Sequence, residues 1–145
     1  MDKNDMETKD CVFCKIIAGA IPTNVVYENE HTLAFLDIRP SNKGHMLVVP
    51  REHYADIFDI PGDVLCALAR TGKRIAGALK KAVQTKGINL IMNNGAVAGQ
   101  IIFHAHLHVL PRFQGDEVFA EPKRVSYDDG EYERIAEKIK NALKK

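Results

Sequence analysis

The 145-residue sequence lacks long apolar runs, a strong net charge and internal repeats. No stretch approaches the ~20 consecutive apolar residues that a membrane-spanning helix needs, and the first ten residues lack the apolar core of a targeting segment. A net charge of +1 gives no global reason to bind nucleic acid or an anionic membrane. We therefore expect a cytoplasmic protein with neither nucleic acid nor a membrane as its partner.

Cysteine is also scarce, and three cysteines cannot all pair with one another. Two of them form Cys11-x-x-Cys14, which in a reducing compartment is more typical of a metal site or a redox pair than of a structural disulfide. The third, Cys66, lies in a helical pattern and is expected to be buried in the core.

The length allows one domain with its own core. Residues 1–9 are polar and charged, so we expect a flexible N-terminal arm there and a single domain over residues 10–145. Apolar periodicity and turn signals predict strands at 24–28, 32–36, 45–49, 88–92 and 103–110. They also predict helices at 13–17, from a start at 61–63 to a stop at Gly87, and at 131–143.

This order of elements predicts an α+β fold with a five-stranded antiparallel sheet, one long helix and a C-terminal helix. The long helix carries a basic face, which we expect to be solvated, formed by Arg70, Lys73, Lys80 and Lys81.

Histidine is concentrated in one place, because three of the six histidines alternate with apolar residues between Phe103 and Phe113. On a strand, His104, His106 and His108 would share one face and could address successive atoms of one extended ligand. The alternatives are a solvated strand and a purely metal-chelating one.

The residues before the histidines, 93–100, are small and glycine-bearing, which favours close approach of backbone N–H groups to an anion such as phosphate. An ordinary Asn-Gly turn is the alternative. Asn93 and the Gln100 amide can both donate to such an anion. A neutral imidazole can attack phosphorus, and His106 is the natural nucleophile, its second ring nitrogen held by an acceptor such as a backbone carbonyl. No acidic pair lies nearby in sequence, so no catalytic metal is expected.

The stretch from His104 to Leu110 resembles the histidine triad (HIT) motif, and the chain is similar to the Hint-like nucleotide-binding branch of that family. The resemblance extends from Cys11 to Phe113 and includes Phe13-Cys-Lys-Ile-Ile-Ala-Gly, Leu33-Ala-Phe-Leu-Asp37-Ile, Gly44-His45-Met-Leu-Val-Val-Pro50, the Asn93-Asn-Gly loop and Gly99-Gln100. It implies a HIT-like fold in which the sheets of two subunits join in a homodimer. It also implies a site for a purine nucleotide such as AMP or GMP in each subunit.

Carried onto this sequence, the resemblance makes His106 the nucleophile that becomes transiently nucleotidylated, with His108 and His104 completing the catalytic triad. Asp37 would bind the ribose hydroxyls. The apolar slot for the base would be formed by Val12, Phe13, Ile16 and Ile38. The phosphate would be surrounded by Asn93, Gly99, Gln100, His106 and His108. The sequence departs from the family at Ile101, where relatives often have a hydroxyl or another polar residue that assists the phosphate.

The resemblance also implies a structural zinc ion with a Cys₂His₂ ligand set: Cys11, Cys14, His53 and His104. Four protein ligands fill a tetrahedral site, so this zinc would do no chemistry. A redox role for the cysteine pair is weakened because no thioredoxin-like strand–helix–strand pattern surrounds it.

These features predict a hydrolase or nucleotidyl transferase. Its substrate would be a purine nucleoside phosphoramidate, an acyl-nucleotide or a dinucleoside polyphosphate, and it would release a nucleoside monophosphate. The alternative is a nucleotide-sensing or partner-binding module with incidental hydrolysis, which Ile101 favours. A zinc-finger-like nucleic-acid binder is a third hypothesis, which the near-neutral charge and the wide ligand spacing disfavour.

Overall fold

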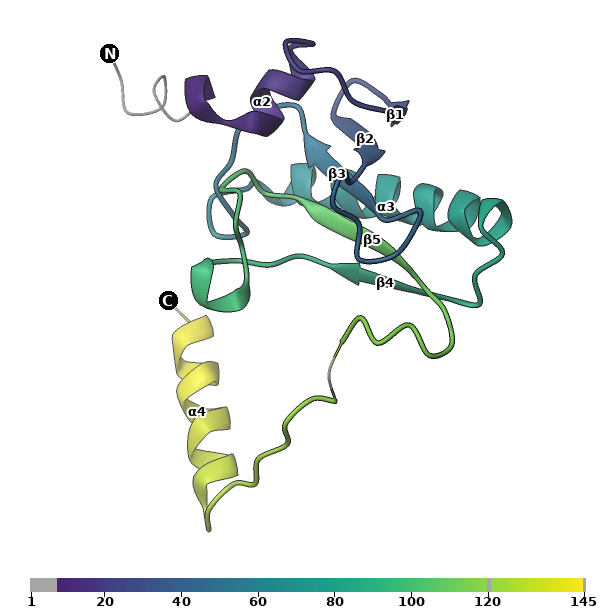
Figure 1. Ribbon diagram of the computed structural model, residues 1–145. Coiled ribbons are helices and arrows are strands. Elements are labelled where there is room, and N and C mark those ends of the chain that lie inside the picture. Colours follow the sequence, from purple (N-terminus) through teal and green to yellow (C-terminus); the bar gives the residue numbers. More distant parts are fainter. Residues whose placement is uncertain (1–7, 120, 145) are drawn as a thin grey trace.

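The structure, a computed structural model, describes residues 8–119 and 121–144. Figure 1 shows one sheet, a long helix, a short helix and a C-terminal helix that stands apart. The helices are α2 (Val12–Ile17), α3 (Gly62–Ala82), α4 (Glu131–Leu143) and the 3-10 helix η1 (Ala96–Ala98). The strands are β1 (Val25–Glu28), β2 (Thr32–Leu36), β3 (Met46–Pro50), β4 (Gly87–Ile91) and β5 (Leu107–Arg112). Of the expected arm, residues 1–7 lie outside the described residues, and residues 8–10 form a helical turn before α2.

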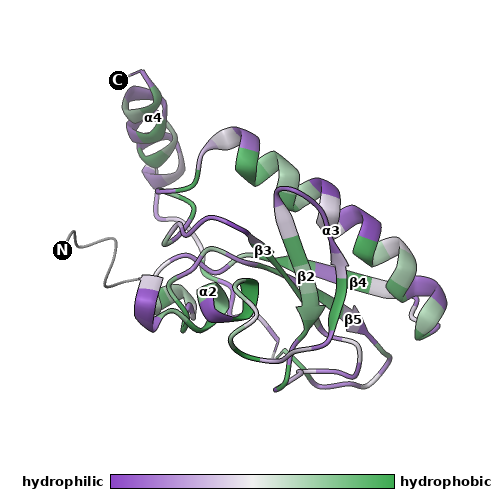
Figure 2. Ribbon diagram, turned by 90° about the horizontal axis from the view of Figure 1, so that it is seen from above, coloured by the Kyte–Doolittle hydropathy of each residue, from purple (hydrophilic) through white to green (hydrophobic). Residues whose placement is uncertain are grey.

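The five strands form one antiparallel sheet in the order β1-β2-β3-β5-β4, which confirms the predicted fold class. β3 is central, and every one of its residues is buried. Figure 2 shows α2 and α3 on opposite sides of the strands. Alternate side chains of β3 therefore enter two separate cores.

The core on the α3 side contains Met46 and Val48 of β3. The core on the α2 side contains Leu47 and Val49, packed with residues of α2. His108 lies directly opposite Leu47 in the ladder between β3 and β5, so its ring is on the α2 side of the sheet. The register of this ladder thus decides which face carries the histidines.

The histidine-bearing strand is shorter than predicted, because β5 begins at Leu107 and not at Phe103. Residues 103–106 lie outside the ladder, and the Ala105 N–H donates to Tyr54 O at 2.6 Å. Ala105 still enters the α3-side core, as does Val109. The strand prediction was wrong for this segment because its backbone is held by the loop after β3 rather than by a neighbouring strand.

The long helix ends at Ala82, five residues before the predicted stop at Gly87. Gln84 has a φ of +53°, the left-handed conformation that commonly follows a helix, and Gly87 instead begins β4.

Cys66 on the long helix is exposed, so the prediction of a buried thiol was wrong. The basic residues of the same helix are exposed as expected: Arg70, Lys73, Lys80 and Lys81.

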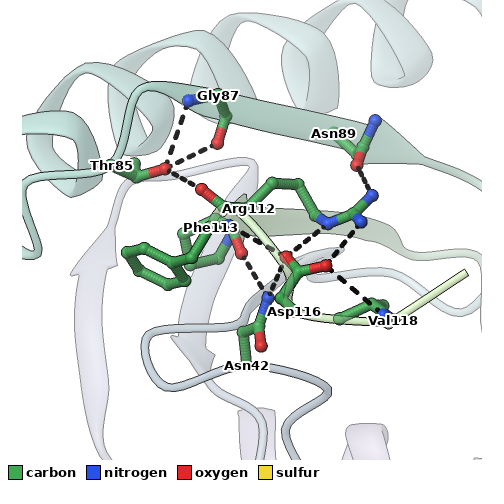
Figure 3. A network of polar contacts seen from close by, with 9 residues as sticks. Asn42, Thr85, Gly87, Asn89, Arg112, Phe113, Asp116 and Val118 are labelled. Atoms are coloured by element: carbon green, nitrogen blue, oxygen red, sulfur yellow. Dashed lines mark hydrogen bonds and ion pairs between the residues drawn. The ribbon is translucent and has the colours of Figure 1, made fainter.

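The chain leaves β5 through a cluster of polar contacts centred on Asp116 (Figure 3). Its carboxylate accepts hydrogen bonds from Arg112 Nε and Nη2 at 2.8 and 2.7 Å. Asn42 Nδ2 and the Phe113 N–H donate to it at 2.8 Å each. Arg112 also donates to Asn89 Oδ1 of β4 at 2.9 Å. Asp116 therefore ties the end of β5 to the loop before β3 and, through Arg112, to β4.

Beyond this cluster the chain extends away from the sheet to α4, whose bounds match the predicted helix at 131–143 (Figure 1). No residue of α4 is buried against the described part of the chain. Among residues 8–119 and 121–144, none of the helices combines the length and the apolar character that crossing a bilayer requires.

Candidate active site and metal centre

His106 is buried immediately before β5. Its Nδ1 lies 2.7 Å from His104 O, and because a carbonyl oxygen only accepts, Nδ1 must carry the proton. The lone pair is then on Nε2, as a nucleophile requires. Phe13 packs edge-on against the ring, with the ring centroids 5.1 Å apart. The expected backbone carbonyl partner thus lies two residues earlier in the same segment.

His108 is held by a histidine that sequence reasoning left without a role. Its Nδ1 lies 2.9 Å from His45 Nε2. The Ser41 N–H donates to His45 Nδ1 at 3.1 Å, so the proton of a neutral His45 is on Nε2. His45 therefore donates to His108 Nδ1, and His108 keeps its own proton on Nε2. The ring centroids of His106 and His108 are 4.9 Å apart. The Nε2 lone pair of His106 and the Nε2–H donor of His108 therefore lie on neighbouring rings.

Burial lowers the pKa of all three of these histidines below the ordinary value. For His108 the pKa falls to about 4, because burial and then the neighbouring His106 and His45 disfavour its charged form. The three rings are thus neutral near pH 7. Attack on phosphorus requires a neutral His106. The hydrogen bond that His45 donates to His108 Nδ1 requires a neutral His108.

Asp37 follows β2 and lies next to this chain of rings. Its Oδ1 accepts the Arg39 N–H at 2.9 Å, and its Oδ2 lies 3.8 Å from His45 Nδ1. Its own N–H donates to His45 O at 2.9 Å. Asp37 therefore caps a turn with one oxygen and presents the other beside the histidines.

The apolar residues expected to hold the base differ in exposure. Phe13 is almost completely buried, between Phe35 and the rings of His104 and His106. Val12 and Ile16 are half-buried, whereas Ile38 is exposed. Phe13 therefore supports the floor of the site, and the other three offer the accessible apolar surface.

The loop between β4 and β5 is braced by the side chain of Gln100. Gln100 Oε1 accepts the Gly95 N–H at 2.9 Å, while Nε2 donates to Ala55 O at 2.7 Å and Ile102 O at 3.1 Å. Both of its amide hydrogens are thus engaged within the protein, contrary to the expectation that they face a phosphate.

Asn93 and Gly99 come together in the same loop. Gly99 has a φ of +92°, and a Cβ built on it would lie 3.7 Å from Asn93 Nδ2. Ile101 is exposed and, with Val12, lines a cavity of about 480 Å³ beside α2.

The four predicted metal ligands converge on one point, with their ligand atoms all within 4.8 Å of one another. Cys11 Sγ and Cys14 Sγ each lie 3.5 Å from His104 Nδ1, and Cys14 Sγ lies 3.4 Å from His53 Nδ1. Tetrahedral zinc, with Zn–S of about 2.3 Å and Zn–N of about 2.0–2.1 Å, places sulfur and nitrogen ligands about 3.5–3.6 Å apart. The spacing therefore fits zinc.

The protonation of this cluster fits a metal as well. His104 Nε2 lies 2.9 Å from Pro50 O, so it carries the proton and leaves Nδ1 free toward the thiols. Burial raises the pKa of Cys14 to about 12, with the adjacent Cys11 adding to the effect. Two thiolates can share this space only beside a cation. His104 is fully buried here, so it reaches His106 through its carbonyl oxygen and not through its ring.

Comparison with known proteins agrees with this arrangement. The family model described as the HIT domain matches residues 18–115. The chain belongs to the HIT family. Among HIT relatives, a HIT-like protein of Methanocaldococcus jannaschii is 52% identical over 122 residues, which cover 82% of this chain and 94% of the relative. A protein of Arabidopsis thaliana named adenylylsulfatase HINT3 is 42% identical, covering 77% of this chain and 56% of that protein.

Two solved structures show the same HIT fold. A histidine triad nucleotide-binding protein from Candida albicans is 32% identical with a TM-score of 0.82, covering 92% of this chain and 97% of its own. A zinc-bound histidine triad family protein from Mycobacterium smegmatis is 38% identical with a TM-score of 0.73, covering 94% and 97%.

Two groups in this HIT chain escaped sequence reasoning. His45 is 63 residues before His108, and Pro50 O is 54 residues before the ring that it orients. His45 stood in a stretch that matched the family, but no local spacing connected it with the triad. The pairing of β3 with β5 brings His45 beside His108, and Pro50 at the end of β3 lies beside the segment that precedes β5.

Proposed function

We propose that this HIT protein is a hydrolase or nucleotidyl transferase that works through a covalent nucleotidyl-histidine on His106. The observation that carries the proposal is the 2.7 Å contact between His106 Nδ1 and His104 O, which holds the lone pair on Nε2. Nε2 forms a bond to the α-phosphorus while the bond from phosphorus to the leaving atom breaks, its electron pair going with the leaving atom. Water then attacks phosphorus and loses one proton to the solvent, while the P–N bond breaks and its electron pair returns to Nε2.

His108 supports this displacement as a hydrogen-bond donor. Its Nε2–H, fixed by His45 on the other side of the ring, can donate to a phosphate oxygen or to the leaving atom. The Oδ2 of Asp37 would accept hydrogen bonds from the ribose hydroxyls, which its position beside the histidines supports. Asn93 and Gly99 would border the phosphate, and Gln100 would position their loop.

The substrate would be a purine nucleotide, AMP or GMP in its simplest form, with an amine, acyl or nucleoside polyphosphate leaving group. The names of the Arabidopsis and Candida relatives support a nucleotide as the common part. The base would lie on Val12, Ile16 and Ile38. Apolar packing of this kind recognises the size of a purine rather than its hydrogen-bonding groups.

The test is incubation with an adenosine phosphoramidate, followed by intact-mass spectrometry. Native protein should release AMP and carry a transient adduct one adenylyl group heavier. His106→Ala should show neither, although AMP still binds to it. Cleavage by His106→Ala at the native rate would contradict the mechanism.

A nucleotide-sensing module is the second candidate, which the apolar, exposed Ile101 favours because a hydroxyl is missing beside the phosphate. This alternative expects AMP binding without cleavage or adduct. Replacement of Ile101 by serine should then raise turnover.

Zinc and a homodimer complete the proposal. Zinc would be held by Cys11, Cys14, His53 and His104, and would anchor the start of the histidine segment without taking part in chemistry. The zinc-bound Mycobacterium relative supports this.

The dimer would extend the sheet at β4, since β1, the other outer strand, carries an irregularity in its ladder that discourages edge pairing. We expect the protein in the cytoplasm.

A further inference from the structure

The basic face of α3 takes no part in the proposed reaction. It borders a groove of about 520 Å³ between this helix and the β1–β2 hairpin, and the groove is lined on the helix side by Arg70, Lys73 and Arg74. Figure 2 shows α2 and α3 on opposite sides of the strands, and the ring of His108 lies on the α2 side. This α3 groove is therefore separate from the active site.

The charge of the α3 groove has one sign. Although the chain has 20 basic and 19 acidic residues, no acidic residue of the described chain lines the groove. Two carboxylates of the neighbouring hairpin are engaged with other partners. Glu28 Oε2 accepts from Arg51 Nη2 at 2.9 Å, and Glu30 Oε1 lies 3.2 Å from His31 Nε2. None of the three helix cations forms an ion pair with a residue that the structure describes, so their charges are available to a ligand.

Arg74 is held in place by the hairpin without losing its charge. Its Cζ lies 4.9 Å from the centroid of the Tyr27 ring. A cation–π contact of this kind orients the guanidinium but does not neutralise it, so its N–H groups can still donate. A guanidinium can bind one phosphate group through two parallel hydrogen bonds. Arg74 is therefore a positioned donor for an oxyanion.

Asn29 adds donors on the hairpin side of the groove. Its Oδ1 accepts the His31 N–H at 2.9 Å and the Thr32 N–H at 2.8 Å, which fixes the orientation of the amide. Its Nδ2 carries two donors that have no partner within residues 8–119 and 121–144. Thr32 Oγ1 also donates to Asn29 Oδ1 at 3.1 Å, and it lies 2.8 Å from the buried Thr71 Oγ1 of α3. This buried link joins the hairpin to the helix, so the groove is formed before a ligand arrives.

We propose that the α3 groove binds an anion with at least two linked phosphate groups. Arg70 and Arg74 are four positions apart on one helix, so their Cβ atoms lie about 5–6 Å apart on the same face. Each can hold a different phosphate group, and Lys73 adds a point charge beside them. The amide of Asn29 would donate from the hairpin. A single phosphate or carboxylate would leave part of this positive charge unpaired.

Free inorganic oligophosphate and the phosphate chain of a nucleotide share this chemistry. Tyr27 is the aromatic residue of the lining, but Arg74 already contacts its ring, which also packs against the α3-side core. No aromatic face of the described lining is thus left for a base, and we expect the phosphate chain to provide the binding free energy. Binding in the α3 groove does not require His106, so this proposal and the proposed hydrolysis can fail separately.

The direct test is calorimetric titration of the full chain with tripolyphosphate. Saturating AMP is present to fill the active site, and about 150 mM salt screens long-range charge attraction. One tripolyphosphate should bind per chain, and ATP should bind with similar affinity. Citrate, an anion of similar charge that has carboxylates, should bind at least tenfold more weakly. Equal binding of citrate, binding of ATP alone, or displacement of AMP by tripolyphosphate would each overturn the proposal.

NMR on the same samples locates the bound anion. Tripolyphosphate should shift the backbone amide signals of residues 70–77 and the side-chain amide signals of Asn29. His106→Ala should bind tripolyphosphate as the native chain does. Shifts confined to residues 93–108 would place the anion in the active site and contradict the proposal.

A matched pair of variants provides the second test. Arg70→Gln removes one cation from the groove and should weaken tripolyphosphate binding at least tenfold. Lys86→Gln removes the same charge from an exposed residue outside the groove and should bind as the native chain does. Both side chains are exposed, so both variants should keep the native melting temperature. Equal affinity of the two variants would contradict a site in the α3 groove.

Discussion

His45 Nε2 lies 2.9 Å from His108 Nδ1, and the Ser41 N–H on the far side of His45 determines the direction of the proton between them. The two rings come from different strand regions, and the ring centroids are 5.1 Å apart. A backbone amide thereby determines which nitrogen of His108 can donate to a substrate. In the proposed reaction His45 would be a positioning residue, because it contacts His108 and not the reacting atoms.

His45→Ala should lower kcat of the nucleotide hydrolysis about fivefold, the equivalent of one lost hydrogen bond of about 1 kcal/mol. His108 would then exchange between its two neutral tautomers. ¹⁵N NMR of the ring nitrogens should show Nε2 protonation in the native protein and a mixture in the variant. His31→Ala, at an exposed histidine, is the control and should leave both readouts unchanged.

Stability should fall as the pH falls from 6.5 to about 4. Burial lowers the pKa of His104 and His108 to about 4, against 6.5 in the unfolded chain. The folded state therefore binds fewer protons across this window, so the stabilisation is complete above pH 6.5 and is lost progressively below it. Melting temperatures of chelator-treated protein should decline over this range, and His108→Asn should flatten the decline.

Activity should follow the neutral form of His106. Its lowered pKa keeps Nε2 unprotonated below the pH at which an exposed histidine would gain a proton. The kcat/KM profile should stay flat from pH 8 to 6.5 and fall at lower pH, with an apparent pKa below 6.5. A half-maximal rate at pH 7 or above would show that another group limits the reaction.

Cys14→Ser should abolish stoichiometric zinc binding and lower the melting temperature by more than about 10 °C, since the metal-binding free energy of such sites contributes to folding. Cys66→Ser is the matched control, because Cys66 is a free and exposed thiol outside the cluster. Metal analysis and melting curves of both variants test this. Full zinc content in Cys14→Ser would contradict the ligand set.

Asp116→Asn should lower the melting temperature at pH 7. The Arg112 guanidinium, with the Phe113 N–H and Asn42, holds the pKa of Asp116 well below its usual range. An amide cannot accept all of these hydrogen bonds. The difference from native protein should shrink as the pH falls below the ordinary carboxyl value, where the unfolded chain takes up a proton. Asp129→Asn, at an exposed carboxylate, should melt as native.

The local pattern of apolar residues in the sequence was enough to predict much of this fold. The C-terminal helix, the sheet of five strands and the basic outer face of α3 were all predictable, because each depends on the period of apolar residues along the chain. The ligand set Cys11, Cys14, His53 and His104 could be named as well, but from resemblance to a family and not from spacing.

Contacts between distant segments decided what local pattern could not. Residues 103–106 alternate in sequence like a strand. In the structure, however, the Ala105 N–H donates to Tyr54 O, and the His104 ring lies against the Cys11 thiol. The Gln100 amide was expected to face a phosphate, but in the structure it donates to Ala55 O, 45 residues earlier in the chain.

By itself, the sequence determined which elements form and which chemical groups are available, because both depend on side-chain identity and on neighbours within a few positions. The tertiary structure alone decided the proton on His106 through His104 O, and the proton on His108 through His45. A hydrogen bond depends on the position of its acceptor to within tenths of an ångström, and only the packed sheet specifies that position.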